Sequence, residues 1–322
     1  MPEVERVRAG PLRRLGQVAR WVAAPALLVV ACWRVDVRAV GGHLTRLDPR
    51  FAVAFLAVSV LFYLLCAWRW SFTARRLGVT LPLGRAFLDY YLSTLLNQVL
   101  PVGIAGDVVR ATRHRRRLGA GWGPAVKAVT LERLSGLLGL TTIVVVSALA
   151  WFARGERRFV LVAAVLGLVA AAVAVAGRLF AARSARFPRL AGLAVDARSA
   201  LVADGALPIQ LAASVAAVVL LLVMFACAGG AVGVPIDVAA ALRIGPILLA
   251  VTTLPWAFAG WGARELSAAA LFGLAGLDPA AGVAVSVAFG VLSLLAATPG
   301  LLVLLLPDRS ARRGGDPDQG RA

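Results

Sequence analysis

Two stretches of the sequence combine proline, glycine and arginine within apolar surroundings. Proline removes a backbone donor and glycine permits turns that other residues resist, so we expect a helix to break in each stretch. A broken helix leaves free N–H groups that attract anions, and a nearby arginine adds a full positive charge. The combination predicts a site for a phosphate group. The residues concerned are Asn97, Pro101, Gly103, Gly106, Asp107 and Arg110 in the first stretch, and Pro255, Gly260, Gly262, Arg264 and Glu265 in the second.

Charged doublets accompany both stretches. Glu132-Arg133 lies within an apolar run, and Arg264-Glu265 closes the second stretch. Adjacent residues on a helix point about 100° apart, so we expect neither doublet to pair with itself. Structural ion pairing and phosphate contact stay open as alternatives for each residue, and so do simple tight turns with arginines facing water. The candidate structural ion pairs are Asp107 with Arg133 or Glu132 with Arg110.

Signals for catalysis are weak. The sequence has no GxSxG, HExxH or P-loop motif, and its three Cys and two His form no metal-binding pattern. We therefore expect neither an enzyme nor a bound cofactor or metal. One enzymatic alternative remains, a lipid-phosphate glycosyltransferase that works through Asp107 or Glu132.

The composition indicates a membrane protein with many spans. Apolar residues make up 60% of the 322-residue chain and charged residues only 16%, and the mean hydropathy is +0.84. A soluble domain has nearer ~45–50% apolar and ~25% charged residues. The net charge of +18 would suggest nucleic acid for a soluble chain. In a membrane protein basic residues set topology and contact anionic lipids, so we expect no nucleic-acid partner.

Apolar runs of about 20 residues are long enough to cross the membrane as helices. Because proline and glycine interrupt 86–105 and 239–261, we predict re-entrant broken-helix hairpins there. The expected fold is an all-α polytopic membrane protein with about six full spans and two such hairpins. The predicted spans lie near 17–36, 51–70, 124–153, 159–180, 207–232 and 280–306.

The distribution of arginine sets the orientation. With a cytoplasmic N-terminus and re-entrant hairpins, the basic segments 110–117 and 178–198 face the cytoplasm, as the positive-inside rule requires. Both would face outward if the hairpins crossed completely. We therefore expect a multi-pass protein of the cytoplasmic (cell) membrane with both termini in the cytoplasm.

The two stretches match each other at one fixed offset of 154, because 264 − 110 and 255 − 101 both give that number. The first unit would enter the membrane from inside and the second from outside, so the repeat is inverted. Inverted repeats with broken helices are typical of transporters, which bind substrate between the repeats. The positions that coincide are Leu100/Leu254, Pro101/Pro255, Ala105/Ala259, Gly106/Gly260 and Arg110/Arg264.

The expected organisation has four parts. Residues 1–16 form a cytoplasmic N-terminal segment and 17–306 a membrane domain, whose repeat units are about 86–152 and 240–306. Within the domain, 181–205 is a cytoplasmic linker with a short surface helix. The polar, glycine-rich residues 307–322 form a disordered tail.

These motifs resemble the lysylphosphatidylglycerol synthase transmembrane (flippase-like) family over roughly 15–306. The resemblance rests on Asn97-x-x-Leu100-Pro101-x-Gly103-x-x-Gly106-Asp107-x-x-Arg110, then Glu132-Arg133-x-x-Gly136, and on Pro255 through Gly260-x-Gly262-x-Arg264-Glu265. The chain departs from the family at Ala105, where a second glycine is usual, and at the bulky Trp256-Ala257-Phe258.

The resemblance implies a flippase-like protein that acts on a polar lipid. In two-domain members a soluble aminoacyl-transferase domain follows the membrane part. Because only a short polar segment follows the last predicted span here, we expect a stand-alone member that does not itself make aminoacylated lipid. The substrate does not transfer with the fold.

The leading interpretation is translocation or binding of a membrane lipid with an anionic, phosphate-bearing head group. Arg110, Arg133 and Arg264 would hold the phosphate. Asp107, Glu132 and Glu265 would position them or relay protons. The alternative is an accessory subunit that assists a lipid-synthesis enzyme of an envelope-lipid or polyprenyl-glycan system.

Overall fold

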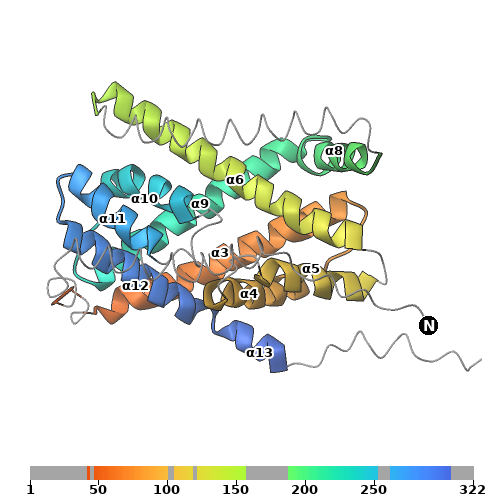
Figure 1. The fold of residues 1–322 in the computed structure, drawn as a ribbon, viewed down its shortest axis with the longest axis horizontal. Helices are drawn as coiled ribbons and strands as arrows, with labels where there is room; N and C mark the ends of the chain where they lie inside the picture. Colours follow the sequence, from red (N-terminus) through yellow and green to blue (C-terminus); the bar gives the residue numbers. More distant parts are fainter. Residues whose placement is uncertain are drawn as a thin grey trace, which may run out of the picture.

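The computed structural model describes residues 42–43, 47–100, 105–118, 122–156, 188–252 and 262–305, and its regular structure there is entirely α-helical (Figure 1). The predicted all-α class is confirmed. The helices are α3 (Pro49–Arg76), α4 (Leu83–Val99), α5 (Ala105–Leu118), α6 (Trp122–Ala153), α8 (Pro188–Leu201), α9 (Ala206–Ala231), α10 (Val238–Thr252), α11 (Ala263–Leu274), α12 (Pro279–Ala297) and α13 (Pro299–Leu305).

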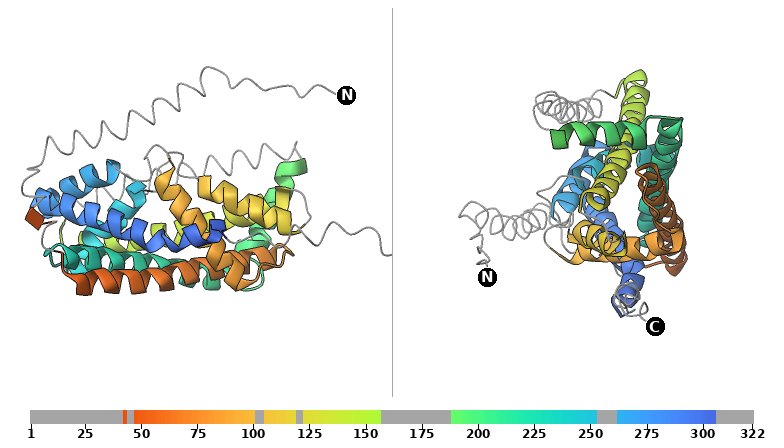
Figure 2. Two further views of the ribbon diagram at one scale, coloured as in Figure 1. Left: turned by 90° about the horizontal axis from the view of Figure 1, so that it is seen from below. Right: turned by 90° about the vertical axis from the view of Figure 1, so that its right-hand side faces the viewer.

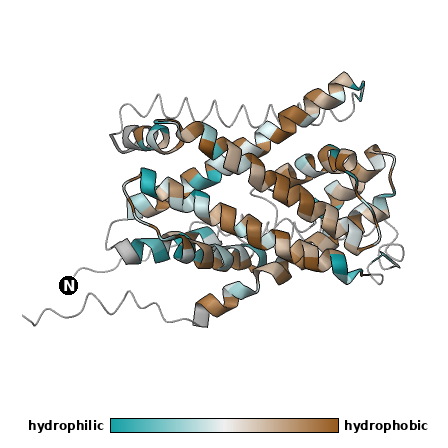
Figure 3. Cartoon of the chain, turned by 180° about the vertical axis from the view of Figure 1, so that it is seen from behind, coloured by the Kyte–Doolittle hydropathy of each residue, from teal (hydrophilic) through white to brown (hydrophobic). Residues whose placement is uncertain are grey.

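Long apolar helices dominate the structure. Figure 3 shows hydrophobic residues along the middle of these helices and hydrophilic residues mainly toward the end of the bundle that holds α5. The segments long and apolar enough to cross a membrane are Pro49–Arg76, Trp122–Ala153, Ala206–Ala231 and Pro279–Val303. They match four of the six predicted spans, and the chain is a multi-pass membrane protein. The predicted spans 17–36 and 159–180 lie outside the described residues.

The surface of these helices suits a lipid environment. Leu137, Val146 and Leu149 of α6 are 44%, 56% and 64% exposed, and Val53 and Leu61 of α3 are 64% and 56% exposed. A soluble protein rarely exposes contiguous apolar surface of this extent. In a bilayer such side chains face acyl chains, while helical hydrogen bonding satisfies the backbone.

The long helices begin at clear sequence signals. Asp48 caps α3 by accepting a hydrogen bond from the Arg50 N–H, and Pro49 occupies the first turn. Asp278 caps α12 in the same way and Pro279 follows it. Proline is favoured at this position because the first-turn N–H groups have no intrahelical acceptor.

α3 and α9 run antiparallel and pack along their length (Figure 2). The Asp48 N–H donates to the Ala231 carbonyl at 2.8 Å, so the start of α3 adjoins the end of α9. At the other end, Gln210 Nε2 of α9 donates to Thr73 Oγ1 of α3 at 2.9 Å. The pair forms one side of the bundle, against which α6 and α12 pack (Figure 2).

Short helices form two packed pairs, α4 with α5 and α10 with α11, toward opposite ends of the long helices (Figure 1). They have 17, 14, 15 and 12 residues. At 1.5 Å per residue none reaches the ~30 Å of the hydrocarbon core. A Cβ on Gly106 would lie 1.9 Å from the Ser93 carbonyl oxygen, so only glycine allows α5 to approach α4 this closely.

The α4–α5 pair penetrates well into the bundle. Gln98 Nε2, near the end of α4, donates to the Ser293 carbonyl at 3.1 Å. Ser293 lies near the middle of the Pro279–Val303 segment. Gly300 of α13 is so close to Tyr91 that an added Cβ would lie 2.7 Å from the Tyr91 carbonyl oxygen. α4 therefore runs beside α13 and ends at the depth of the middle of α12.

The order of helices recurs at the predicted offset. Moving α3, α4, α5 and α6 by 154 positions brings them over α9, α10, α11 and the α12–α13 segment. Packing recurs too, because α6 contacts α9 and α10 while α12 contacts α3 and α4. This correspondence includes α3 and α9, which lie outside the predicted units 86–152 and 240–306. A two-fold axis relating the units stays a prediction.

The predicted linker 181–205 contains α8. Arg76 Nη2 at the end of α3 donates to the Ser199 carbonyl at 2.9 Å and to the Ala203 carbonyl at 2.6 Å, which ties α8 and the following turn to α3. The predicted N-terminal segment 1–16 and tail 307–322 lie outside the described residues.

Candidate functional site

Five charged residues meet where α3, α5 and α6 come together. We call Arg69, Asp107, Arg110, Glu132 and Arg133 the charged cluster. Arg69, Arg110 and Glu132 are 3%, 1% and 2% exposed. Charges this deeply buried require paired partners, because desolvation is otherwise too costly.

Glu132 is the centre of the cluster. Its Oε1 lies 3.1 Å from Arg69 Nη2 and its Oε2 lies 3.0 Å from Arg110 Nη2. Arg69 Nη2 also donates to the Glu132 carbonyl at 2.8 Å and to Ser135 Oγ at 2.9 Å. The predicted Glu132–Arg110 pair is confirmed, and Glu132 is the shared counterion of two buried arginines.

Aromatic rings and a second carboxylate hold the Arg110 guanidinium. Its central carbon lies 4.6 Å from the Trp70 ring centroid and 4.9 Å from the Tyr90 ring centroid, both within cation–π range. Its Nη2 also contacts Asp107 Oδ1 at 3.2 Å. Arg110 is therefore fixed on several sides and has little contact with solvent.

Asp107 links the buried part of the cluster to its open edge. Arg133 Nη2 lies 2.8 Å from Asp107 Oδ2 and 3.0 Å from Oδ1, so the predicted Asp107–Arg133 pair is also confirmed. The Asp107 side chain is 15% exposed and that of Arg133 is 51% exposed. Arg133 is the accessible cation of the cluster.

The cluster carries an excess of positive charge. Three arginines face two carboxylates, which leaves one net positive charge in an apolar setting. A charge that must be stabilised there attracts a counter-anion, and Arg133 is the member with room to bind one. The geometry therefore suits a phosphate or a similar anion at Arg133.

Asn97 and Gly106 have structural contacts at the start of α5. Asn97 Oδ1 accepts a hydrogen bond from the Gly106 N–H at 2.8 Å, which joins the two arms of the α4–α5 pair. This backbone donor, predicted as part of an anion site, is thus already bound by an amide. Pro101 and Gly103 lie outside the described residues.

The second motif holds a closed ion pair. Arg264 Nη2 lies 2.9 Å from Glu265 Oε1, with side chains 8% and 1% exposed. The expectation that this doublet cannot pair with itself is wrong. Glu265 bends back to accept the Gly262 N–H at 2.6 Å, and Gly262 has φ of +80°, which favours glycine. The long Arg264 side chain then reaches the same carboxylate, while Pro255 and Gly260 lie outside the described residues.

Equivalent positions of the two units make equivalent contacts. Arg264 and Ser286 stand 154 positions after Arg110 and Glu132, and Arg264 Nε donates to Ser286 Oγ at 3.0 Å. In the first unit Glu132 supplies the carboxylate that pairs with the arginine, whereas in the second unit Glu265 supplies it. The positions equivalent to Asp107 and Arg133 hold Trp261 and Val287, so the second unit has no charged counterpart of the open edge.

Arg69 is the site residue that sequence reasoning missed. It directly follows the uncharged run Phe51–Trp68, where an arginine reads as an interfacial anchor. One sequence signal could have found it. Arg69 adjoins one end of the run Phe51–Trp68, and Glu132 and Arg133 adjoin one end of the run Leu134–Ala153, so all three can lie at the same depth in the membrane. Within the described ranges, no group of three or more His, Cys, Asp or Glu side chains converges as a metal site would require.

These features define a multi-pass helical membrane protein with a buried arginine–carboxylate cluster beside a short helical pair. Residues 17–300 match the family described as lysylphosphatidylglycerol synthase TM region, and the chain belongs to that family. Membership relates the protein to lipid modification or flipping. A comparison with curated proteins found no match.

Proposed function

We propose that this protein binds a polar, phosphate-bearing lipid and moves its head group across the cytoplasmic membrane. The observation that carries the proposal is the charged cluster, in which three arginines face two carboxylates and Arg133 is half exposed. A lipid phosphate supplies the negative charge that the cluster lacks.

The depth of the charged cluster in the membrane supports a lipid ligand. The run Phe51–Trp68 of α3 ends directly before Arg69, and the run Leu134–Ala153 of α6 begins directly after Arg133. Each run is about as long as the hydrocarbon core is thick. The cluster therefore lies near one edge of that core, where a lipid phosphate resides.

The α4–α5 pair offers a polar path from this edge inward. In our proposal it is a re-entrant hairpin that enters from the cytoplasm, and α10–α11 enters from the opposite side. The length of the four helices and the contact between Gln98 and Ser293 at mid-span support this topology. Both termini then lie in the cytoplasm, as the arginine distribution favours.

The residues have different roles in this proposal. Arg133 contacts the phosphate and exchanges Asp107 for it, because the carboxylate and the phosphate compete for one guanidinium. Arg69 and Arg110 act through Glu132 and position the cluster. Arg264 and Glu265 form a neutral pair. In our proposal this pair attracts the phosphate less than the charged cluster does, so the head group is released on this side.

A non-catalytic role is favoured over a glycosyltransferase. Glu132 accepts contacts from two arginines, and Asp107 also contacts two. Because guanidinium groups already occupy both carboxylates, neither is placed to take a proton from a substrate hydroxyl. An accessory role beside a lipid-synthesis enzyme is the second proposal, and it predicts lipid binding without transfer.

Reconstitution in liposomes tests the proposal. Purified protein is placed in vesicles with headgroup-labelled anionic or zwitterionic phospholipids, and transfer between leaflets is followed by loss of accessible label. We expect transfer of the anionic lipid and a loss of at least tenfold in Arg133→Gln. Arg154→Gln is the matched control, since Arg154 is an exposed arginine just after the end of α6. Equal transfer by Arg133→Gln and wild type would refute Arg133 as the phosphate-binding residue. Binding without transfer would favour the accessory role.

A further inference from the structure

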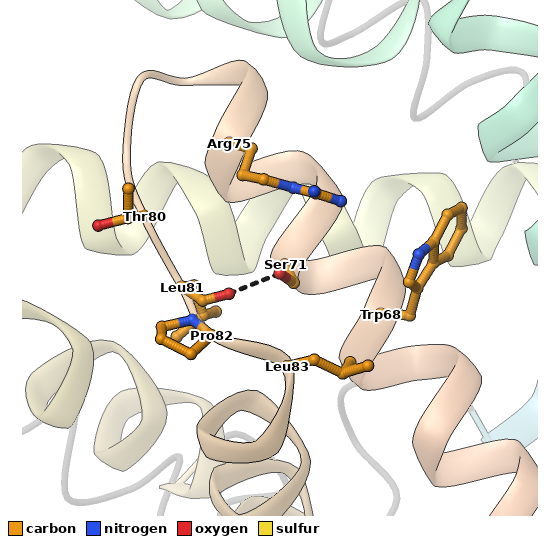
Figure 4. Close-up of a pocket in the computed structure, with 7 residues that line it drawn as sticks. All are labelled: Trp68, Ser71, Arg75, Thr80, Leu81, Pro82 and Leu83. Carbon is orange, nitrogen blue, oxygen red and sulfur yellow. Dashed lines mark hydrogen bonds between the residues drawn. The ribbon is translucent and has the colours of Figure 1, made fainter.

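A pocket lies at the turn between α3 and α4, apart from the charged cluster (Figure 4). Its volume is about 420 Å³, within the range of small-molecule sites. α3 contributes Trp68, Ser71 and Arg75, which recur at helical spacing and share one face. The turn contributes residues 80–83.

Contacts between α3 and the turn form one wall of the pocket. Ser71 Oγ donates to the Leu81 carbonyl at 2.6 Å and holds the turn against α3 (Figure 4). Leu81 is 4% exposed and anchors the turn in the apolar core. Pro82 restricts the backbone at the point where α4 begins.

Arg75 is the charged group of the pocket. Among the described residues it has neither an ion pair nor a hydrogen-bond partner for its side chain, whereas the adjacent Arg76 binds Asp204 Oδ2 at 3.1 Å. No carboxylate lines the pocket. Figure 4 shows Arg75 and Trp68 on the same side of α3, with Thr80 across the turn.

The pocket combines the groups found at lipid head-group level. Trp68 ends the uncharged run of α3, and Arg75 lies two turns further along the helix. Tryptophan and arginine concentrate at this depth, because the ring is amphipathic and the guanidinium reaches the phosphates. Leu81, Pro82 and Leu83 add an apolar surface beside this charge.

We infer that this pocket binds the head group of an anionic phospholipid. Arg75 contacts the phosphate, and Trp68 with Leu83 contacts the glycerol and the first methylenes. The site is separate from the cluster at Arg133 and holds whether or not the protein translocates lipid.

Quenching of tryptophan fluorescence by lipids brominated near the glycerol tests this site. The chain has eight Trp, so the Trp68 signal is the difference between wild type and Trp68→Phe. Wild-type protein is reconstituted in phosphatidylcholine with increasing amounts of brominated phosphatidylglycerol or brominated phosphatidylcholine. We expect brominated phosphatidylglycerol to quench Trp68 at a clearly lower mole fraction.

Arg75→Gln should raise the required mole fraction about fivefold, the factor that one arginine contributes near an anionic surface. Thr80→Val should leave the mole fraction unchanged, because the Thr80 side chain points away from Arg75 (Figure 4). Arg85→Gln is the matched control, because Arg85 is exposed, lies in the first turn of α4 and does not line the pocket. Equal quenching by both lipids, an unchanged Arg75→Gln or an equal loss in Arg85→Gln would overturn the inference. Relief of quenching by millimolar glycerol phosphate would overturn the choice of a lipid.

Discussion

Arg110 Nη2 lies 3.0 Å from Glu132 Oε2, and the two side chains are 1% and 2% exposed. The contact joins α5 to α6 at a point where Arg69 of α3 binds the other carboxylate oxygen. Arg110 is thus a positioning residue in this structure. Arg133, at the open edge, is the accessible arginine of the cluster, with a side chain that is 51% exposed.

Removal of the Glu132 charge should destabilise the protein. In Glu132→Gln two buried arginines lose their shared counterion, and breaking a buried pair typically costs about 3–5 kcal/mol. Thermal unfolding in detergent measures the effect. Asp204→Asn is the control, because Asp204 is 84% exposed and such a pair contributes at most about 1 kcal/mol. Similar melting temperatures for the two variants would contradict the central role of Glu132.

Arg133→Lys should restore only part of the lipid transfer lost in Arg133→Gln. Arginine donates two hydrogen bonds to one phosphate, whereas lysine offers a point charge. We expect transfer between that of wild type and that of Arg133→Gln, with unfolding close to wild type. Full recovery in Arg133→Lys would mean that charge alone suffices.

Gly106→Ala should separate the arms of the α4–α5 pair. The added Cβ would lie 1.9 Å from the Ser93 carbonyl oxygen, and backbone cannot swing away as a side chain can. Overpacking of this kind costs about 1–3 kcal/mol or more. Gly84→Ala is the matched control, since its Cβ meets nothing within 4 Å. Purified yield and melting temperature are measured for both variants. Equal stability of the two would refute the close approach of α5 to α4.

A carboxylate at position 286 should replace Glu265 as the ion-pair partner of Arg264. Glu265→Gln removes its carboxylate, and we expect a large loss of stability. Adding Ser286→Asp returns a carboxylate at the position equivalent to Glu132 and should recover part of that loss. Recovery stays partial because the larger side chain must fit a fully buried site. No recovery in the double variant would count against equivalence of the two units.

Cysteine labelling tests the re-entrant topology. Single cysteines at Arg116→Cys and Val238→Cys, in a chain whose three natural cysteines are serine, should react from opposite sides of the membrane. Both positions are exposed, Val238 at 76%. Labelling of both from one side would exclude the proposed hairpins and the inverted repeat together.

The sequence determined the features that depend on local composition. Uncharged runs marked the spans because a helix in lipid must be apolar over about 20 residues. The Pro-Gly-Arg stretches marked where α4 and α10 end, and the offset of 154 anticipated the correspondence of helices. The pairs Asp107–Arg133 and Glu132–Arg110 were among the alternatives that the sequence left open, because a buried charge needs a counterion but contact with a phosphate could replace pairing.

Only the tertiary structure decided which charge is accessible. Packing of α3 against α6 brings Arg69 to Glu132 and closes Arg110 between two rings, while Arg133 points to the open edge. The pairing of Arg264 with Glu265 depends on how the chain turns at Gly262, which a helical spacing rule does not contain. Hydropathy is a property of segments, whereas ion pairs depend on side-chain reach between helices that lie far apart in the sequence.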